Sequence, residues 1–283
     1  MALFIILGVI LLLMSVLAVM KQPGYIYKNE KSEQNPMQGK NVRFVASETD
    51  PENADGVRGH LIAVGETSHK AGLYEAVIKR FFDIALSFLG VVILSPLFLF
   101  LFIWIWIDDP GPILFKQKRI GKDKRYFKIH KFRTMKMNAP HDLSTHCLGD
   151  SEPYLTRAGR FIREHSLDEL PQIWDIFVGN MSVIGPRPVI WNEDGLIVER
   201  DCWGANDIKP GLTGWAQING RDNLSNVEKA RLDGEYVKKM GILMDLKCFF
   251  KSFGVVFKKD SSALGKDLIC ETDCTADDKM KRA

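Results

Sequence analysis

Long apolar runs alternate with charged segments along this chain of 283 residues, and two of the runs are suited to a membrane. Residues 1–20 contain no charged side chain, and at about 1.5 Å per residue they reach about 30 Å, one hydrocarbon thickness. A cleaved signal peptide is not favoured, because the apolar run has no basic region in front of it and no small-x-small cleavage site after it. We therefore predict a transmembrane helix, and Lys21, Lys28 and Lys31 place the following chain in the cytoplasm by the positive-inside rule.

The second apolar run, residues 84–107, carries Ser95-Pro96 in its middle. As one straight helix the run would extend about 36 Å and span the bilayer, whereas each half alone would reach only about the midplane. Proline removes a backbone donor and clashes with the preceding turn, while the Ser95 hydroxyl can bond to a freed carbonyl. A bend is therefore expected at this position, but proline alone does not exclude a kinked span.

Charge on both sides of this run favours a hairpin. Lys79 and Arg80 come directly before it, and nine Lys or Arg against one Asp follow within residues 116–133. A spanning helix would put one cluster on the wrong side of the membrane, whereas a re-entrant helix-break-helix keeps both in the cytoplasm. We predict the re-entrant form and keep the kinked span as the alternative.

The remaining pattern predicts an α+β, membrane-associated protein whose catalytic domain is mainly helical with a short β-hairpin. Residues 21–71 are polar and predict a largely flexible cytoplasmic linker with one short strand over 60–64. Near Leu73 helical spacing begins, with Lys79 and Arg80 placed to pair with Asp83. The expected domain covers residues 72–258, and a disordered tail covers 259–283. Within the domain we expect strands over 113–121 and 126–135 and helices over 155–165, 167–179, 226–240 and 246–257, the last on the membrane surface.

Net charge and cysteine count narrow the class of protein. The formal net charge is only +3, but positive charge is concentrated at residues 116–133. This basic block needs an anionic partner or a membrane surface nearby. Aromatic residues interleave with this block, as in some nucleic-acid sites, but its place directly after a membrane insert favours lipid phosphates over nucleic acid. Five cysteines, an odd number with no zinc-like spacing, indicate reduced thiols: Cys147, Cys202, Cys248, Cys270 and Cys274.

An acidic pair carries the strongest candidate chemistry, because no P-loop, dinucleotide or HExxH motif occurs. In "SLDELPQ", Ser166 and Glu169 fit a capping box, which gives the pair a purely structural explanation. Alternatively, a helix N-terminus holds Asp168 ionised as a nucleophile, and Glu169 helps to bind a divalent cation. The pair by itself leaves both interpretations open.

Basic residues around the pair favour the chemical interpretation. Arginines recur every three residues on the helix before it, and further cations stand in "KFRTM" and "GPRP". Such donors suit attack on a phosphoryl group, because an anionic nucleophile can approach it only if cations neutralise the phosphate. The candidate phosphate-binding residues are Arg157, Arg160, Arg163, Lys131, Arg133 and Arg187.

Together these segments resemble the bacterial sugar transferases, the monotopic polyprenyl-phosphate phosphoglycosyl transferases. The resemblance runs from about Leu73 to Lys258, roughly two thirds of the chain. It rests on eight features in the family's order: "KRFFD", the Ser-Pro of the hairpin, "DDPGPILFKQKRIG", "KFRTM", "LTRAGRFIR", "SLDELPQ", "NMSVIGPRP" and "KPGLTGWAQINGR".

The resemblance implies a membrane enzyme that acts in two steps. Asp168 would take a sugar-1-phosphate from a nucleoside diphosphate sugar, usually a UDP-sugar, and release UMP. It would then pass the phosphosugar to a polyprenyl phosphate such as undecaprenyl phosphate, starting capsule, exopolysaccharide or glycan synthesis at the cytoplasmic face of a bacterial cell membrane. Glu169 would assist with Mg²⁺ and Arg163 would pair with Asp168, while the implied phosphate and nucleotide contacts are Lys131, Arg187 and Arg221.

Two alternatives and two departures accompany this expectation. A glycosyltransferase would release UDP instead of UMP, and a scaffold of a polysaccharide assembly complex would release neither. Residues 1–72 hold one span and a linker, which differs from small and large members of the family, and we expect a simple second anchor. Lys124 stands where many relatives have glycine. The sequence does not identify the sugar, the polymer or a homo-oligomer.

Overall fold

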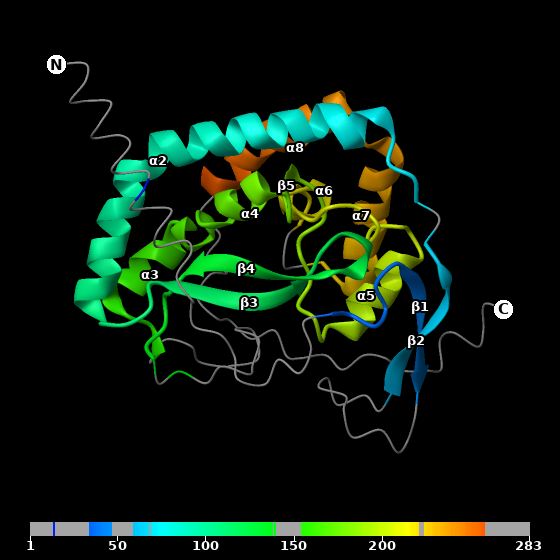
Figure 1. Ribbon diagram of the computed structural model, residues 1–283, viewed down its shortest axis with the longest axis horizontal. Coiled ribbons are helices and arrows are strands. Elements are labelled where there is room, and N and C mark those ends of the chain that lie inside the picture. The colour runs from blue at the N-terminus through cyan, green and yellow to red at the C-terminus, as the bar shows by residue number, and fades with distance from the viewer. Residues whose placement is uncertain are drawn as a thin grey trace.

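The computed structural model describes residues 14, 34–46, 59–67, 69–137, 139, 154–220 and 224–257. Within these ranges the fold has one long helix, several shorter helices and three two-stranded sheets, and the sheet nearest the N-terminus in sequence projects at one end (Figure 1). The mixed helix and strand class is confirmed. The predicted helix over 1–20 (apart from Met14), the candidate Arg221 and the tail over 259–283 lie outside the described residues.

The second apolar run forms helix α2 (Arg80–Asp108), which follows a π-helical turn, η1 (Tyr74–Lys79). Figure 1 shows that α2 changes direction, with one arm along the top of the domain and the other down its side. We attribute this bend to Pro96, which lies inside the helix, and Ser95 Oγ donates to the carbonyl of Val92 at 2.7 Å. The predicted break is therefore a bend in one continuous helix. By length and composition Tyr74–Asp108 could cross a membrane.

The second arm of α2 packs into the domain core. Its buried residues Phe98, Leu101 and Ile105 pack with Leu114 and with Ile162 of α3 (Arg157–Glu164). The predicted β-hairpin is confirmed, because β3 (Leu114–Ile120) pairs antiparallel with β4 (Tyr126–Phe132). The arm is thus fixed to the sheet that carries the basic residues.

The predicted helices beyond the hairpin are also confirmed. Gly179, at φ +97°, follows α4 (Gln172–Val178), so this helix ends where the helix predicted over 167–179 ends. A capping box of Ser225 and Glu228 starts α7. The helices and strands of this part are α3 (Arg157–Glu164), η5 (Leu167–Glu169), α4 (Gln172–Val178), β5 (Ser182–Ile184), α5 (Asp194–Asp201), β6 (Gly211–Thr213, parallel to β5), α6 (Trp215–Ile218), α7 (Asn226–Lys239) and α8 (Ile242–Phe257).

The predicted pairing of Lys79 and Arg80 with Asp83 is wrong. Lys79 Nζ bonds to Asp245 Oδ2 at 2.5 Å, and Arg80 donates to two carbonyls at the end of α4. Asp83 accepts two hydrogen bonds from β5. Since Lys79 and Asp83 are buried, partners from distant elements replace the exposed pairs that the spacing predicted.

Part of the expected linker is folded. Strands β1 (Lys40–Ala46) and β2 (Gly59–Glu66) form an antiparallel hairpin, so the strand predicted over 60–64 is confirmed. Val42 is buried with Ile120, Val189 and Ile197 of the domain expected over 72–258. The linker interpretation is therefore wrong for β1, because Val42 is buried against this domain, whereas β2 is mostly exposed.

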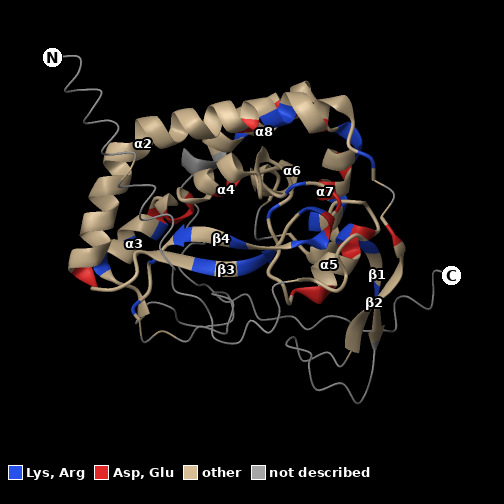
Figure 2. Cartoon of the chain, in the orientation of Figure 1, with Lys and Arg blue, Asp and Glu red and all other residues tan. Residues whose placement is uncertain are grey.

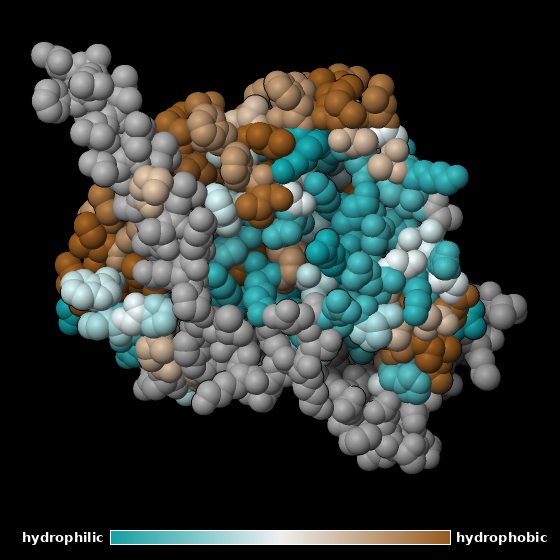
Figure 3. All heavy atoms as spheres, in the orientation of Figure 1, coloured by the Kyte–Doolittle hydropathy of each residue, from teal (hydrophilic) through white to brown (hydrophobic). Residues whose placement is uncertain are grey.

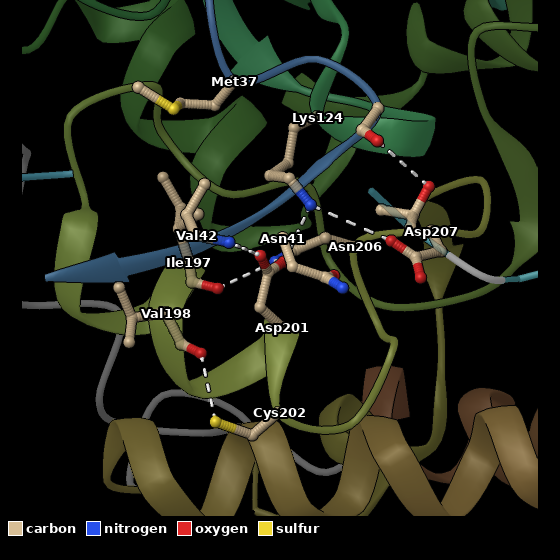
Figure 4. A network of polar contacts seen from close by, with 12 residues as sticks. Met37, Asn41, Val42, Lys124, Ile197, Val198, Asp201, Cys202, Asn206 and Asp207 are labelled. Carbon is tan, nitrogen blue, oxygen red and sulfur yellow. Dashed lines mark hydrogen bonds and ion pairs between the residues drawn. The ribbon is translucent and has the colours of Figure 1, made fainter. Parts of the chain in front are cut away.

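Lys124 holds this hairpin in place (Figure 4). The residue is fully buried in a left-handed conformation at φ +58°, where glycine would be unstrained. Its Nζ lies 2.9 Å from Asp201 Oδ1, and the other oxygen of Asp201 accepts the Val42 amide at 2.7 Å. The Lys124 carbonyl accepts from Asn35 Nδ2 at 2.7 Å. Lys124 therefore joins the hairpin to the domain.

We expect Lys124→Met to destabilise the chain by about 3–5 kcal/mol, because it leaves Asp201 buried without its cation. Thermal unfolding of the full chain in detergent measures this loss. The matched control is Lys239→Met, which breaks an exposed pair with Glu235 and should change the unfolding temperature little. Equal, small changes for both variants would contradict a structural role for Lys124.

Candidate active site

The acidic pair lies in the turn η5, between α3 and α4. The side chains of Asp168 and Glu169 are 19% and 16% exposed, so both reach a partly open site. Ser166 adopts a left-handed conformation at φ +53°, and its side chain caps no helix. The predicted capping box is therefore wrong, because this backbone conformation is unlike that of an N-cap residue.

Two cations from other elements hold Glu169. Lys131 of β4 places Nζ 3.0 Å from Glu169 Oε1, and Arg187, in the loop after β5, places Nη2 2.7 Å from the same oxygen. Figure 2 shows the Lys and Arg residues concentrated along β3 and β4. Burial alone would raise the pKa of Glu169, but Arg187 and Lys131 hold that pKa well below its usual range. Glu169 is therefore a fixed carboxylate in the site.

Asp168 is held much more loosely. Its closest contact is between Oδ2 and Lys131 Nζ at 3.4 Å, and among the described residues no hydrogen bond reaches its Oδ1. A carboxylate with a free oxygen beside fixed cations is suited to attack an electrophile, whereas Glu169 is occupied. The geometry thus separates two adjacent carboxylates into an available one and a fixed one.

The arginines of α3 differ in their relation to the pair. Arg163 Nε donates to Thr134 Oγ1 at 2.9 Å, and no ion pair with Asp168 is found in the described part of the chain. Burial lowers the pKa of Arg163, while the charge of Asp168 acts to raise it, so the two groups interact electrostatically without direct contact. Arg157 and Arg160, also on α3, are exposed to solvent.

Arg133 contacts the end of α2 and not the acidic pair in the described part of the chain. This side chain is only 5% exposed, and its Nη2 donates to the carbonyl of Asp109 and lies 3.5 Å from the Asp109 carboxylate. Burial lowers the pKa of Arg133. The contacts assign it to the end of α2, so the structure does not bring this predicted phosphate ligand to the acidic pair.

Sequence reasoning missed the residues that position Arg187. Arg200 of α5 donates from Nη1 to the carbonyl of Arg187 at 2.8 Å, and its Nε donates to Asp233 Oδ2 of α7 at 2.9 Å. Arg119 of β3 donates to the next carbonyl, of Pro188, at 3.0 Å. Arg200 and Asp233 are buried. The available signal in the sequence was a pair of opposite charges at positions where a helix would place buried residues.

The chain matches known proteins over this same domain. A family profile described as bacterial sugar transferase matches residues 74–259. The chain belongs to the bacterial sugar transferase family. The resemblance inferred from the motifs is thereby confirmed, and the match includes α2, the basic hairpin and the acidic pair.

Several relatives share this domain at similar identity. UDP-glucose:undecaprenyl-phosphate glucose-1-phosphate transferase of Escherichia coli is 36% identical over 62% of this chain and 39% of its own length. Undecaprenyl-phosphate galactose phosphotransferase of Salmonella typhimurium is 34% identical over 65% of this chain and 41% of its own length. Exopolysaccharide production protein ExoY of Sinorhizobium fredii is 36% identical over 64% of this chain and 85% of its own length. The match thus spans about two fifths of the first two relatives.

The charge pair in the site predicts a specific pH dependence. The lowered pKa of Glu169 stabilises the folded state above the usual glutamate pKa, about 4.3, and this stabilisation is lost as the pH falls towards the folded-state value. Arg187→Met should raise the pKa of Glu169. We therefore expect the difference in unfolding temperature between wild type and Arg187→Met to be largest above about pH 5 and to shrink towards pH 3.

The exposed Arg157→Met variant is the control, and its difference from wild type should not vary in this way. A difference for Arg187→Met that stays constant or grows as the pH falls would contradict the Glu169–Arg187 pair.

Proposed function

We propose that this chain transfers a sugar-1-phosphate from a UDP-sugar to a polyprenyl phosphate, such as undecaprenyl phosphate, and releases UMP. The observation that carries the proposal is the division of the acidic pair. Within the described residues no hydrogen bond reaches Asp168 Oδ1, whereas Lys131 and Arg187 hold Glu169. The printed names of relatives add support, because they include undecaprenyl-phosphate sugar phosphotransferases and exopolysaccharide production proteins.

The proposed reaction proceeds through two displacements at phosphorus. Asp168 attacks the phosphorus that bears the sugar, its carboxylate oxygen forms a new P–O bond, and the bond to the bridging oxygen breaks. UMP leaves with that oxygen and the electron pair, so an aspartyl-phosphosugar remains on the chain. An oxygen of the polyprenyl phosphate then attacks the same phosphorus and frees the Asp168 carboxylate. A covalent relay lets a soluble anion and a lipid anion use one site in turn.

The surrounding cations have separate tasks in this proposal. Lys131 lies within reach of both carboxylates, so it is placed to neutralise charge on the phosphoryl group beside Asp168. Arg187 fixes Glu169 and adds a second positive charge beside the phosphoryl group. Arg163 and Arg160 on α3 would extend this field, and Arg221 retains the nucleotide role that the resemblance implies.

The acidic pair also fits Mg²⁺ in combination with the donor. Among the described residues no group of three or more His, Cys, Asp or Glu could hold a metal ion. Mg²⁺ commonly takes only one or two carboxylates and completes its shell with substrate phosphates and water. In the part of the chain that the structure describes, no hydrogen bond reaches Asp168 Oδ1, and Glu169 Oε2 has a 3.5 Å contact with Arg187, so these two residues would hold the ion. A bound Mg²⁺ would neutralise charge on the diphosphate.

The apolar surface supports a membrane location. Figure 3 shows hydrophobic side chains gathered along the edge of the molecule formed by α2. On α8, Leu243 and Phe250 are 81% and 67% exposed, whereas Lys247 and Lys251 fold back over the Trp215 ring. We propose that α2 enters the membrane as the predicted re-entrant helix and that α8 lies on the surface, with the catalytic domain on the cytoplasmic face of the bacterial inner membrane.

Release of UMP from UDP-sugars by the full chain in membranes tests this function. Asp168→Asn should lower UMP release by about a thousandfold or more, because an amide is a poor nucleophile and leaves no carboxylate to form the adduct. Glu164→Gln, which changes an exposed carboxylate on α3, is the matched control and should retain the wild-type rate. Unchanged turnover of Asp168→Asn would contradict the nucleophile, and release of UDP would indicate a glycosyltransferase.

A further inference from the structure

A second charged site lies at the beginning of the long apolar helix. A cavity of about 210 Å³ opens between η1, the start of α2 and the loop before β6. It is smaller than the roughly 300–1,000 Å³ of pockets that enclose drug-sized ligands, so it suits a single polar group. Its charged lining residues are Lys79, Arg80, Lys122 and Lys209 with Glu75 and Asp83.

The two acidic residues of this cavity already have partners. Asp83 Oδ1 accepts from Ser182 Oγ at 2.9 Å and from the Val183 amide at 2.8 Å. Glu75 bonds to Lys122 at 2.9 Å and to the ring of His69 at 2.8 Å. Burial would raise the pKa of Glu75, but Lys122 and His69 lower it overall. The carboxylates are thus engaged with the protein itself.

Two of the four cations form no ion pair within the described part of the chain. Lys79 pairs with Asp245 and Lys122 with Glu75, but the guanidinium of Arg80 donates to the neutral carbonyls of Ile176 and Phe177. Lys209 is half-buried, and in the described part of the chain no hydrogen bond or ion pair reaches its Nζ. Burial, and then the charge of Arg80, lowers the pKa of Lys209, whereas the charge of Asp83 acts to raise it. An anion in the cavity would relieve this repulsion.

The cavity is separate from the acidic pair. Arg80 contacts the C-terminal end of α4, whereas the acidic pair precedes its N-terminal end. The seven residues of α4 extend about 10 Å, which sets the scale of the separation. None of Asp168, Glu169, Lys131 and Arg187 lines the cavity.

Exposed apolar side chains stand beside the cavity on two helices. Leu73 and Val77 flank the lining residues of η1, and they are 74% and 57% exposed. On the other side, Met240 lines the cavity and is followed by Ile242 and Leu243, which are 49% and 81% exposed. An amphipathic ligand could therefore put a charged group into the cavity while its hydrocarbon lies along these side chains.

We propose that this cavity binds the phosphate of an anionic membrane phospholipid through Lys209 and Arg80. The bound headgroup neutralises the two cations and fixes the start of α2 at the membrane surface. The inference rests on the membrane location of α2 proposed above, but it does not involve the transfer chemistry.

Native mass spectrometry of the full chain in detergent tests this site with phosphatidylglycerol as the probe. We expect wild type to retain one molecule of phosphatidylglycerol in preference to phosphatidylcholine. Lys209→Met should weaken this retention about fivefold or more, because it removes a cation beside the headgroup. Lys209→Arg, which keeps the charge, should bind like wild type, and Lys239→Met is the control for an exposed lysine outside the cavity.

Two outcomes would overturn the proposal. One is equal retention of phosphatidylglycerol by wild type and Lys209→Met. The other is binding of soluble glycerol 3-phosphate as tight as that of the lipid, which would assign the cavity to a free phosphate. Asp168→Asn should bind phosphatidylglycerol like wild type, so the result does not depend on transferase activity.

Discussion

The contact of Glu169 with Lys131 and Arg187 determines how the candidate active site works. It joins three distant parts of the chain, namely the turn before α4, strand β4 and the loop after β5. Lys131 and Arg187 both lie closer to Glu169 than to Asp168, and among the described residues no hydrogen bond reaches Asp168 Oδ1. Two adjacent carboxylates would otherwise be chemically equivalent, and this asymmetry gives the proposed reaction one nucleophile.

Much of the fold serves to keep this contact in place. The second arm of α2 packs under the hairpin that carries Lys131, so the apolar helix also supports the catalytic sheet. Arg187 is positioned through its backbone, since Arg200 holds its carbonyl and Asp233 holds Arg200. Removing one partner of such a buried pair is costly, because it leaves the other charge without compensation. The buried Arg200–Asp233 pair therefore links helix packing to the geometry of the site.

Local patterns in the sequence predicted much of this structure, but not its long-range polar contacts. The β3–β4 hairpin, the helices α3, α4 and α7, and the glycine that ends α4 followed from periodicity and capping residues, which act over a few positions. The pairing of Lys79 with Asp245 and the role of Arg200 depend on elements far apart in the chain. Strand β1 was missed, although the strand over 60–64 was predicted, because β1 is held by contacts with α5 and the β3–β4 turn, including the buried Lys124.

The most direct test of the division between Asp168 and Glu169 is mass spectrometry of the full chain incubated with a UDP-sugar in the absence of polyprenyl phosphate. An adduct with the mass of one phosphosugar on the peptide that carries Asp168 is the expected result. It should disappear when polyprenyl phosphate is added, and it should be absent in Asp168→Asn. An adduct on Glu169, or UMP release at the full wild-type rate with no adduct on either residue, would contradict the proposed role of Asp168.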